Sequence, residues 1–393
     1  MTKSTNQTML DSVALKIKYP SFRVTNPDFF TPALNLGQTA PSFSYGHNRY
    51  MTYRQNPTAM DKKEDIYKPR LTVNQRFDDG MPSWDLLIEF SIPKLLYDQS
   101  LQETDEGDCE KVVSKLQFRL QRMGVQVTTD VIRNAIVNKA HFCKNIPLSP
   151  PLTAQGVIAE LYKADPGLRK DVNMRHYENG GQSLYFYATA ANIIFYDKIK
   201  DISTSKNRAV EKDKFDREKM LLANAPEEKK PELLRFEVRF ARQASLEAFL
   251  SRVMHKKVKD IPLVRIFDKN LCRDVLLASW DKIVGTPTSQ LALKMTMPIE
   301  EVFDAIIRNL GEMRNAHSLN NALAGLGIYI LINQHGSRNT RKKIERNWSN
   351  RSWKRLAKKI QAAAVTLKDL PTSHAIQDVH AALLKFERYD WHE

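Results

Sequence analysis

Cysteine is scarce in this 393-residue chain. Cys109, Cys143 and Cys272 cannot all pair, and no two of them have the Cys-x-x-Cys spacing of a zinc ribbon. So few thiols are typical of a reducing compartment. Long apolar runs are missing too, because the longest, Ala324 to Ile332, is far short of the about 20 residues that span a bilayer. Residues Met1 to Asn6 open no apolar signal core, so we expect a cytoplasmic protein with no membrane partner.

Acidic side chains are outnumbered. The chain has 45 aspartates and glutamates against 60 lysines and arginines, a formal net charge of +15. This excess is larger than solubility requires, so we expect a polyanionic partner, with nucleic acid ahead of an anionic membrane surface. The length leaves room for two domains.

Hydrophobic periodicity is weak at the N-terminus and strong after it. Residues 1–84 mix proline, glycine, asparagine and aromatic residues without a sustained period, which predicts short strands and loops. The elements predicted next are a strand over Leu86–Ile92, a helix over Glu110–Met123, a strand over Val131–Phe142, a helix over Thr153–Tyr162 and a hairpin around Asn179-Gly180-Gly181. This order predicts an α+β fold, with an antiparallel sheet and helices on one face.

The chain therefore divides into three expected parts: an irregular, strand-rich segment over 1–84, a sheet domain over 85–290 and a mainly helical, basic domain over 291–393. A charged stretch from Lys206 to Pro231 predicts an exposed amphipathic helix inserted between two strands. Helices are predicted over Leu246–Met254, Cys272–Trp280 and Ile299–Leu310.

Two predicted strands flank that insertion and carry reactive side chains. In Leu233–Phe240, alternation places Arg235, Glu237 and Arg239 on one face, so that a carboxylate stands between two cations. In Asn192–Lys198, the same rule places Tyr196 and Lys198 on one face and turns Asp197 away. If the two strands are neighbours, these polar groups can converge.

Basic residues are densest between Arg338 and Lys359, where ten cations accompany the single acid Glu345. Ser349 is a candidate N-cap for a helix with the apolar stripe Trp353, Leu356 and Ile360. The cations expected to point outward and contact DNA are Arg351, Lys354, Arg355, Lys358 and Lys359. With the preceding helical stretch this resembles a helix-turn-helix unit, although a solvated basic helix without groove specificity fits equally well. Phosphate contact is expected in either case, because such dense cations repel one another.

The order of these motifs resembles a known family. A strand-Tyr-x-Lys followed roughly forty residues later by Arg-Phe-Glu-x-Arg is similar to rolling-circle replication initiators, in particular the gene II proteins of filamentous phages and the related Rep_trans plasmid initiators. Lys139-Ala140-His141-Phe142 stands where that family has Arg-Ile-Asp-x, and Ile88 to Lys94 resembles the opening of its substrate domain. The resemblance covers roughly residues 85 to 290.

The resemblance implies a nickase that cuts one strand of a double-stranded phage or plasmid origin in the cytoplasm of a host cell. Tyr196 would attack the scissile phosphate and keep the 5′ side as a phosphotyrosine. A phenol with a pKa of about 10 needs a cation or metal to become a nucleophile. Lys198 would stabilise the phenolate or the phosphate, and Glu237 would bind a divalent ion, Mg or Mn, or activate the closing attack. Arg235 and Arg239 would hold phosphates, and a host helicase would be needed to extend the opened duplex.

Several alternatives stay open. Tyr185 and Tyr187 are alternative candidates for the nucleophile, and the pattern around Tyr196 is also that of a structural tyrosine in a strand. Glu237 between two arginines fits a structural ion pair. His141 replaces an aspartate of the family, and as a metal ligand its imidazole suits manganese better than magnesium. A DNA-binding regulator or structural protein that kept the fold and lost catalysis is the second functional hypothesis.

Overall fold

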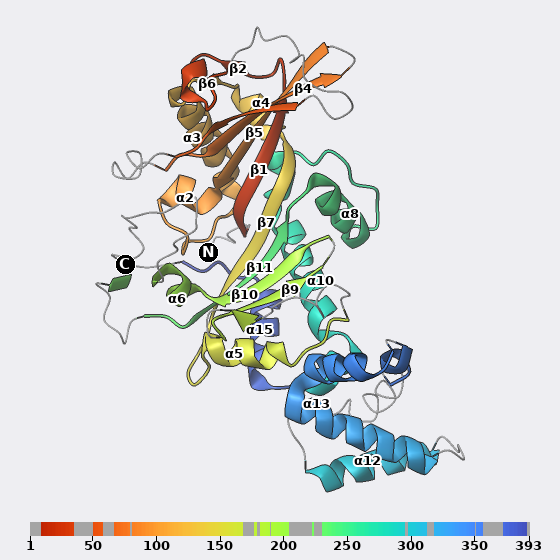
Figure 1. The fold of residues 1–393 in the computed structure, drawn as a ribbon. Helices are drawn as coiled ribbons and strands as arrows, with labels where there is room; N and C mark the ends of the chain where they lie inside the picture. Colours follow the sequence, from red (N-terminus) through yellow and green to blue (C-terminus); the bar gives the residue numbers. More distant parts are fainter. Residues whose placement is uncertain are drawn as a thin grey trace.

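The fold is α+β, as the sequence predicts. The computed structural model describes residues 9–34, 50–57, 67–78, 81–167, 177–178, 181–188, 190–203, 222–223, 230–294, 298–312, 318–349, 351–356 and 372–390. These residues form an antiparallel sheet of nine strands followed by a mostly helical C-terminal part (Figure 1).

The nine strands follow the order β3-β4-β5-β1-β7-β11-β10-β9-β8, and every neighbouring pair is antiparallel. Their bounds are β1 Leu10–Lys18, β3 Tyr50–Gln55, β4 Arg70–Asp78, β5 Met81–Ser91, β7 Ile136–Pro147, β8 Tyr177–Glu178, β9 Ser183–Tyr187, β10 Asn192–Asp197 and β11 Leu233–Phe240. A separate two-stranded sheet joins β2 Arg23–Val24 to β6 Val125–Gln126.

The α-helices are α2 Ile92–Tyr97, α3 Cys109–Arg122, α4 Thr129–Arg133, α5 Ala154–Tyr162, α6 Lys198–Ser203, α8 Gln243–Val253, α9 Leu263–Ile266, α10 Lys269–Val284, α11 Pro287–Ala292, α12 Ile299–Glu312, α13 Ser318–Asn347 and α15 His374–Lys385. Short 3₁₀ turns cover Pro27–Phe29 and Glu106–Asp108. Thr153 caps α5 by accepting a hydrogen bond from the Gly156 N–H, as the sequence predicts for this residue type.

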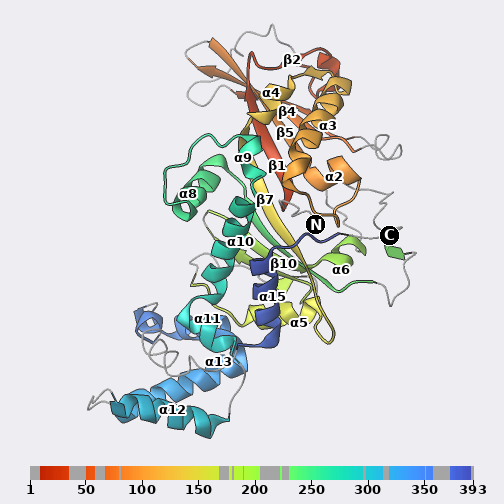
Figure 2. The same cartoon turned by 180° about the vertical axis from the view of Figure 1, so that it is seen from behind.

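Alternation gives the sheet one apolar and one polar face. On β1, Val13, Leu15 and Ile17 are buried in the main core, and the intervening Lys16 pairs with Asp85 of β5 at 3.0 Å on the other face. Helices α5, α8, α10 and α15 pack on the apolar face of β7, β9, β10 and β11 (Figure 2). These four helices share one face, as predicted, whereas α6 packs through Ile202 against Leu233 on the opposite face, which carries most of the polar side chains. We call it the polar face.

The N-terminal segment is part of this sheet, which corrects the expectation of short strands and loops. Strand β1 lies in the middle of the sheet between β5 and β7, and the expected boundary between residues 84 and 85 falls inside β5. The strand predicted over Val131–Phe142 also needs correction, because residues 131–133 belong to α4 and β7 begins at Ile136.

The C-terminal part forms a smaller core and then returns to the sheet. Helices α11, α12 and α13 share a second apolar cluster that contains Val302, Tyr329 and Trp353. Helix α15 packs back into the main core (Figure 1), so residues 291–393 do not form one separate helical unit. Most of the predicted insertion, Lys206–Pro231, lies outside the described residues.

None of the helices in the described ranges is long and apolar enough to cross a membrane. The three cysteines are buried, and none forms a disulfide.

Candidate active site

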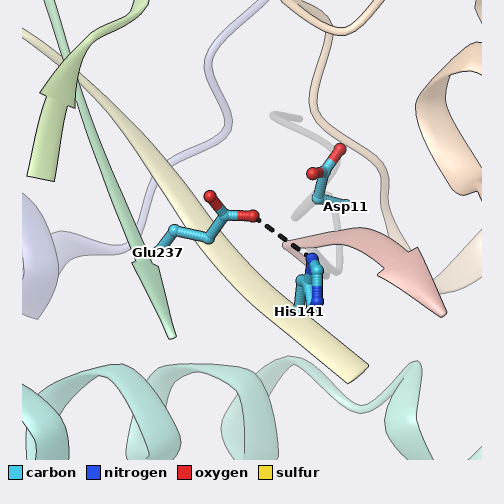
Figure 3. A group of neighbouring side chains, drawn as sticks. All are labelled: Asp11, His141 and Glu237. Carbon is cyan, nitrogen blue, oxygen red and sulfur yellow. Dashed lines mark ion pairs between the residues drawn. The ribbon is translucent and has the colours of Figure 1, made fainter. Parts of the chain in front are cut away.

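Three side chains from three adjacent strands meet on the polar face. Asp11 comes from β1, His141 from β7 and Glu237 from β11, and each offers one ligand atom within 4.8 Å of the other two. Figure 3 shows Glu237 and His141 turned toward each other with Asp11 beside them; Glu237 Oε1 lies 3.6 Å from His141 Nδ1. Glu237 is fully buried, whereas His141 and Asp11 keep some solvent contact. The structure thus places Asp11 beside His141 and Glu237, the two residues predicted to bind a metal ion.

A β-bulge places Asp11 in this group. Leu10 pairs with Phe142 and Val13 pairs with Ala140, so two residues of β1 oppose the single residue His141 of β7. Leu10 and Val13 are both buried in the core, and a regular strand would need only one residue between them. The extra residue turns Asp11 to the polar face beside His141, which is how bulges commonly re-aim a side chain.

The predicted convergence of β10 and β11 is confirmed, and the register fixes its detail. Directly opposed residues of an antiparallel sheet share a face. Three cross-strand rows therefore run over β7, β11, β10 and β9 on the polar face: Asn145, Arg235, Tyr196 and Ser183; then Cys143, Glu237, Ile194 and Tyr185; then His141, Arg239, Asn192 and Tyr187. Tyr196 is thus a diagonal neighbour of Glu237, and its side chain is partly exposed.

Arg239 holds the inner carboxylate and still reaches solvent. Its Nη2 donates to Glu237 Oε2 at 2.6 Å, and about a third of its side chain is exposed. Burial by itself would raise the pKa of Glu237, but the charges of Arg239, His141 and Arg235 hold that pKa well below its ordinary value. Glu237 is therefore an anion at neutral pH, and Arg239 has the position expected of a phosphate ligand.

Arg235 has a different role from the predicted one. It is 1 % exposed, and its guanidinium bonds Asp11 at 3.2 Å, Asn145 Oδ1 at 3.2 Å and the Ser100 carbonyl at 3.1 Å. A phosphate arriving from solvent cannot reach a group enclosed in this way. Arg235 lies beneath the site and orients Asp11, which corrects the expectation that it binds DNA.

Lys198 is also displaced from its predicted position. Strand β10 ends at Asp197, and Lys198 starts α6, so Lys198 does not continue the face of Tyr196. Its Nζ donates to Ser100 Oγ at 2.6 Å and is buried. Since the Ser100 carbonyl accepts from Arg235, Lys198 contributes to the frame behind Tyr196. Asp197 turns away from Tyr196 as predicted and accepts from the Lys200 N–H at 3.0 Å, at the start of α6.

The phenol of Tyr196 is protonated at neutral pH in this arrangement. Burial raises the pKa of Tyr196 well above its ordinary value, the Glu237 carboxylate raises it further, and Arg235 opposes both effects. Nucleophilic chemistry at this oxygen therefore needs an additional cation close to it. The three-residue group beside it supplies a place for one.

The residues of this group fit a divalent metal ion. Glu237 Oε1 is buried, makes no hydrogen bond within the described residues and lies 3.6 Å from His141 Nδ1. Two carboxylates and one imidazole form a donor set of oxygen and nitrogen atoms. Such a mixed set suits manganese and related ions better than magnesium, which prefers oxygen ligands. Three protein ligands leave coordination positions free for water or phosphate oxygens.

The C-terminal basic stretch divides into buried and exposed cations. Helix α13 breaks at Gly336, where φ is +76° and an added Cβ would lie 2.9 Å from Lys163 Cα, so the close approach to α5 requires glycine. Past this break, Arg341 forms a buried ion pair with Asp165 at 3.0 Å. The Arg338 guanidinium lies over the Phe186 ring, 4.4 Å from its centroid. These two arginines fasten the helices to the sheet domain and do not face DNA.

The predicted cap at Ser349 is confirmed, since its Oγ accepts from the Ser352 N–H at 3.3 Å. Residues 351–356 are helical, Trp353 is buried in the second core, and Leu356 packs against it, as the predicted stripe requires. Arg351, Lys354 and Arg355 are exposed on the outer side. The remaining predicted contacts, Lys358 and Lys359, lie outside the described residues together with Ile360.

Sequence reasoning missed Asp11. The signal for its strand is present, because Val13, Leu15 and Ile17 alternate with polar residues. The bulge interrupts that alternation between Leu10 and Val13, and nothing local shows that this strand pairs with the one that contains His141. Comparisons of the chain with protein-family models, with curated proteins and with solved structures find no match in any of the three. Function therefore has to be argued from these residues.

Proposed function

We propose that the chain initiates rolling-circle replication by cutting one strand of a phage or plasmid origin and later joining the ends through a phosphotyrosine on Tyr196. The observation that supports this most directly is the placement of Tyr196 diagonally across from Glu237, on the face that carries Asp11 and His141. A tyrosine nucleophile beside a group that can bind a metal ion is a constellation suited to phosphodiester transfer.

In the proposed reaction the Tyr196 oxygen forms a bond to the scissile phosphorus as the bond to the 3′ oxygen breaks. The phenol loses its proton, the departing 3′ oxygen gains one, and the 5′ phosphate stays on Tyr196. Asp11, His141 and Glu237 would hold a divalent ion, Mg or Mn, which supplies a positive charge to the phenolate and to the phosphoryl oxygens. Arg239 contacts a non-bridging oxygen of the same phosphate. Joining is the reverse reaction, with an incoming 3′-hydroxyl as the nucleophile.

Duplex binding belongs to a second surface in this proposal. The exposed cations Arg351, Lys354 and Arg355 contact phosphates of the origin duplex, and the preceding helix α13 is held against the sheet domain through Arg341 and Arg338. The freed 3′ end primes synthesis, and a host helicase separates the strands ahead of it.

The deciding experiment is a denaturing-gel assay for a covalent adduct. End-labelled single-stranded oligonucleotides that tile the replicon encoding the protein are incubated with the full chain and either manganese or magnesium. The wild type is expected to give a labelled adduct that survives denaturation, and Tyr196→Phe to give none. Tyr185→Phe and Tyr187→Phe are the matched controls, and both are expected to retain the adduct.

Other outcomes separate the alternatives. An adduct that persists in Tyr196→Phe and disappears in Tyr185→Phe or Tyr187→Phe moves the nucleophile to that residue. The absence of an adduct with either ion, while DNA binding is intact, would favour the non-catalytic DNA-binding protein. The histidine at position 141, where the family that the chain resembles has an aspartate, is in line with that alternative.

A further inference from the structure

Two tyrosines stand beside the candidate active site without a role in the proposed reaction. Tyr185 and Tyr187 are stacked, with ring centroids 5.8 Å apart and ring planes at 14°. Both are partly exposed, whereas Leu184 and Phe186, which alternate with them on β9, are fully buried. The pair therefore lies on the polar face and not in the core.

The register fixes where the pair lies. Tyr185 shares a cross-strand row with Ile194 and Glu237, and Tyr187 shares one with Asn192 and Arg239. Strands are about 4.8 Å apart, so each tyrosine lies about 10 Å, two strand spacings, from its partner on β11.

We propose that Tyr185 and Tyr187 form a stacking platform for an unpaired base of the DNA strand that is cut, next to the scissile phosphate. This inference rests on the proposed function and adds its substrate class, which is a strand already separated from its complement at the point of cleavage. A paired base is stacked on its neighbours within the duplex, and only an unpaired one can lie on the rings.

The chemistry of the surroundings favours a nucleotide as the occupant. Aromatic rings accept any base face, and a groove that binds single strands combines such rings with cations that follow the backbone. Here the partly exposed Arg239 lies in the same row as Tyr187, so one nucleotide can place its phosphate at Arg239 and its base on the tyrosines. Ile194, buried between Glu237 and Tyr185, gives this path an apolar floor.

The test uses the full chain, manganese and a single-stranded oligonucleotide of mixed sequence that carries 2-aminopurine at one position. Stacking on the tyrosines is expected to quench the 2-aminopurine fluorescence of the bound wild-type complex. The variant Tyr185→Leu/Tyr187→Leu removes the rings, and Tyr185→Phe/Tyr187→Phe keeps them. We expect the leucine variant to bind about 5-fold to 150-fold more weakly and to lose the quenching, and the phenylalanine variant to match the wild type.

Equal affinity and equal quenching in the two double variants would overturn the platform, and so would unchanged wild-type affinity when the bases of the oligonucleotide are replaced by abasic sites. Binding of duplex DNA checks that the leucine variant is folded. The adduct assay tests the nickase separately from the platform. Quenching without any adduct would support the platform and reject the nickase activity. An adduct without ring-dependent binding would reject the platform and support the nickase activity.

Discussion

Arginines in two regions of this protein have the same charge and opposite surroundings. On β11, Arg235 is enclosed by Asp11, Asn145 and Ser100, and each bond fixes the position of a neighbouring group. On the helix after Ser349, Arg351 and Arg355 are exposed to solvent. An enclosed arginine positions its neighbours, while an exposed one is available to a polyanion. The comparison teaches that burial, and not residue type, decides which cations are candidates for contacting DNA.

The largest effect is expected from breaking the buried ion pair of Arg341 and Asp165. Asp165→Asn leaves the Arg341 guanidinium buried without its counter-charge, which is expected to lower the free energy of unfolding by about 3–5 kcal/mol. Urea unfolding measures this change. The matched control is Glu160→Gln, which breaks the partly exposed pair with Lys163 and should cost no more than about 1 kcal/mol. Equal losses would show that Arg341 is not a positioning residue.

The next largest effect is expected at the metal ligands. Glu237→Gln removes an anionic ligand and should weaken Mn²⁺ binding by more than about 100-fold, beyond what the loss of an outer-shell partner costs. Calorimetric titration of the full chain gives the dissociation constant. Glu89→Gln is the control, because Glu89 is a carboxylate of the same face that pairs with Arg70 and Lys139. Unchanged Mn²⁺ affinity in Glu237→Gln would remove the proposed site.

A smaller effect is expected at the exposed cations. The triple change of Arg351, Lys354 and Arg355 to alanine removes three phosphate contacts, so the salt dependence of duplex binding should become shallower by about 2.7 in log–log slope. When the salt concentration rises from 50 to 200 mM, the affinity of the wild type for duplex DNA should therefore fall about 40-fold more than that of the variant.

Filter binding at several salt concentrations measures that slope. The control replaces Lys256, Lys257 and Lys259, which are exposed and far along the chain from this helix, and it removes the same charge. The same change of slope in both variants would mean that net charge, and not this helix, governs duplex binding.

The smallest effect sharpens the comparison within β11 itself. Arg239→Gln frees Glu237 Oε2 from a cation 2.6 Å away, so the free protein should bind Mn²⁺ about tenfold more tightly, a gain of about 1.4 kcal/mol. The same change should weaken binding of a single-stranded oligonucleotide, because a phosphate ligand is lost. Mn²⁺ titration followed by electron paramagnetic resonance measures the first effect, with Arg242→Gln as the control. Weaker Mn²⁺ binding in Arg239→Gln would contradict this account.

Local sequence pattern was sufficient to predict those elements whose own residues show a clear periodicity or a capping residue. The bounds of β11 agree with the prediction, because Leu234, Phe236, Val238 and Phe240 alternate with polar residues over the whole strand. The cap of α5 at Thr153 and the cap at Ser349 were likewise predictable, since both depend on a few adjacent residues.

Hydrophobic periodicity predicted the wrong element at two places, where the residues next to each other in the chain favour a strand. The stretch from Val131 is apolar enough for a strand, yet Thr128 caps a helix there by accepting from the Val131 N–H. Lys198 fits the alternation of β10, yet the strand ends at Asp197, whose side chain accepts from the Lys200 N–H at the start of α6. In both places a single side-chain oxygen that accepts a hydrogen bond from a backbone N–H decides the backbone conformation, and hydrophobic periodicity does not reveal it.

The sequence by itself determined the α+β class, the two strands that carry Tyr196 and Glu237, and the basic character of the chain. Only the tertiary structure decided that the N-terminal β1 lies beside β7, that a bulge turns Asp11 toward His141, and that Arg235 is buried while Arg239 is partly exposed. The physical reason is that period and capping act between neighbours in the chain, whereas strand order and burial depend on pairing between segments far apart in it.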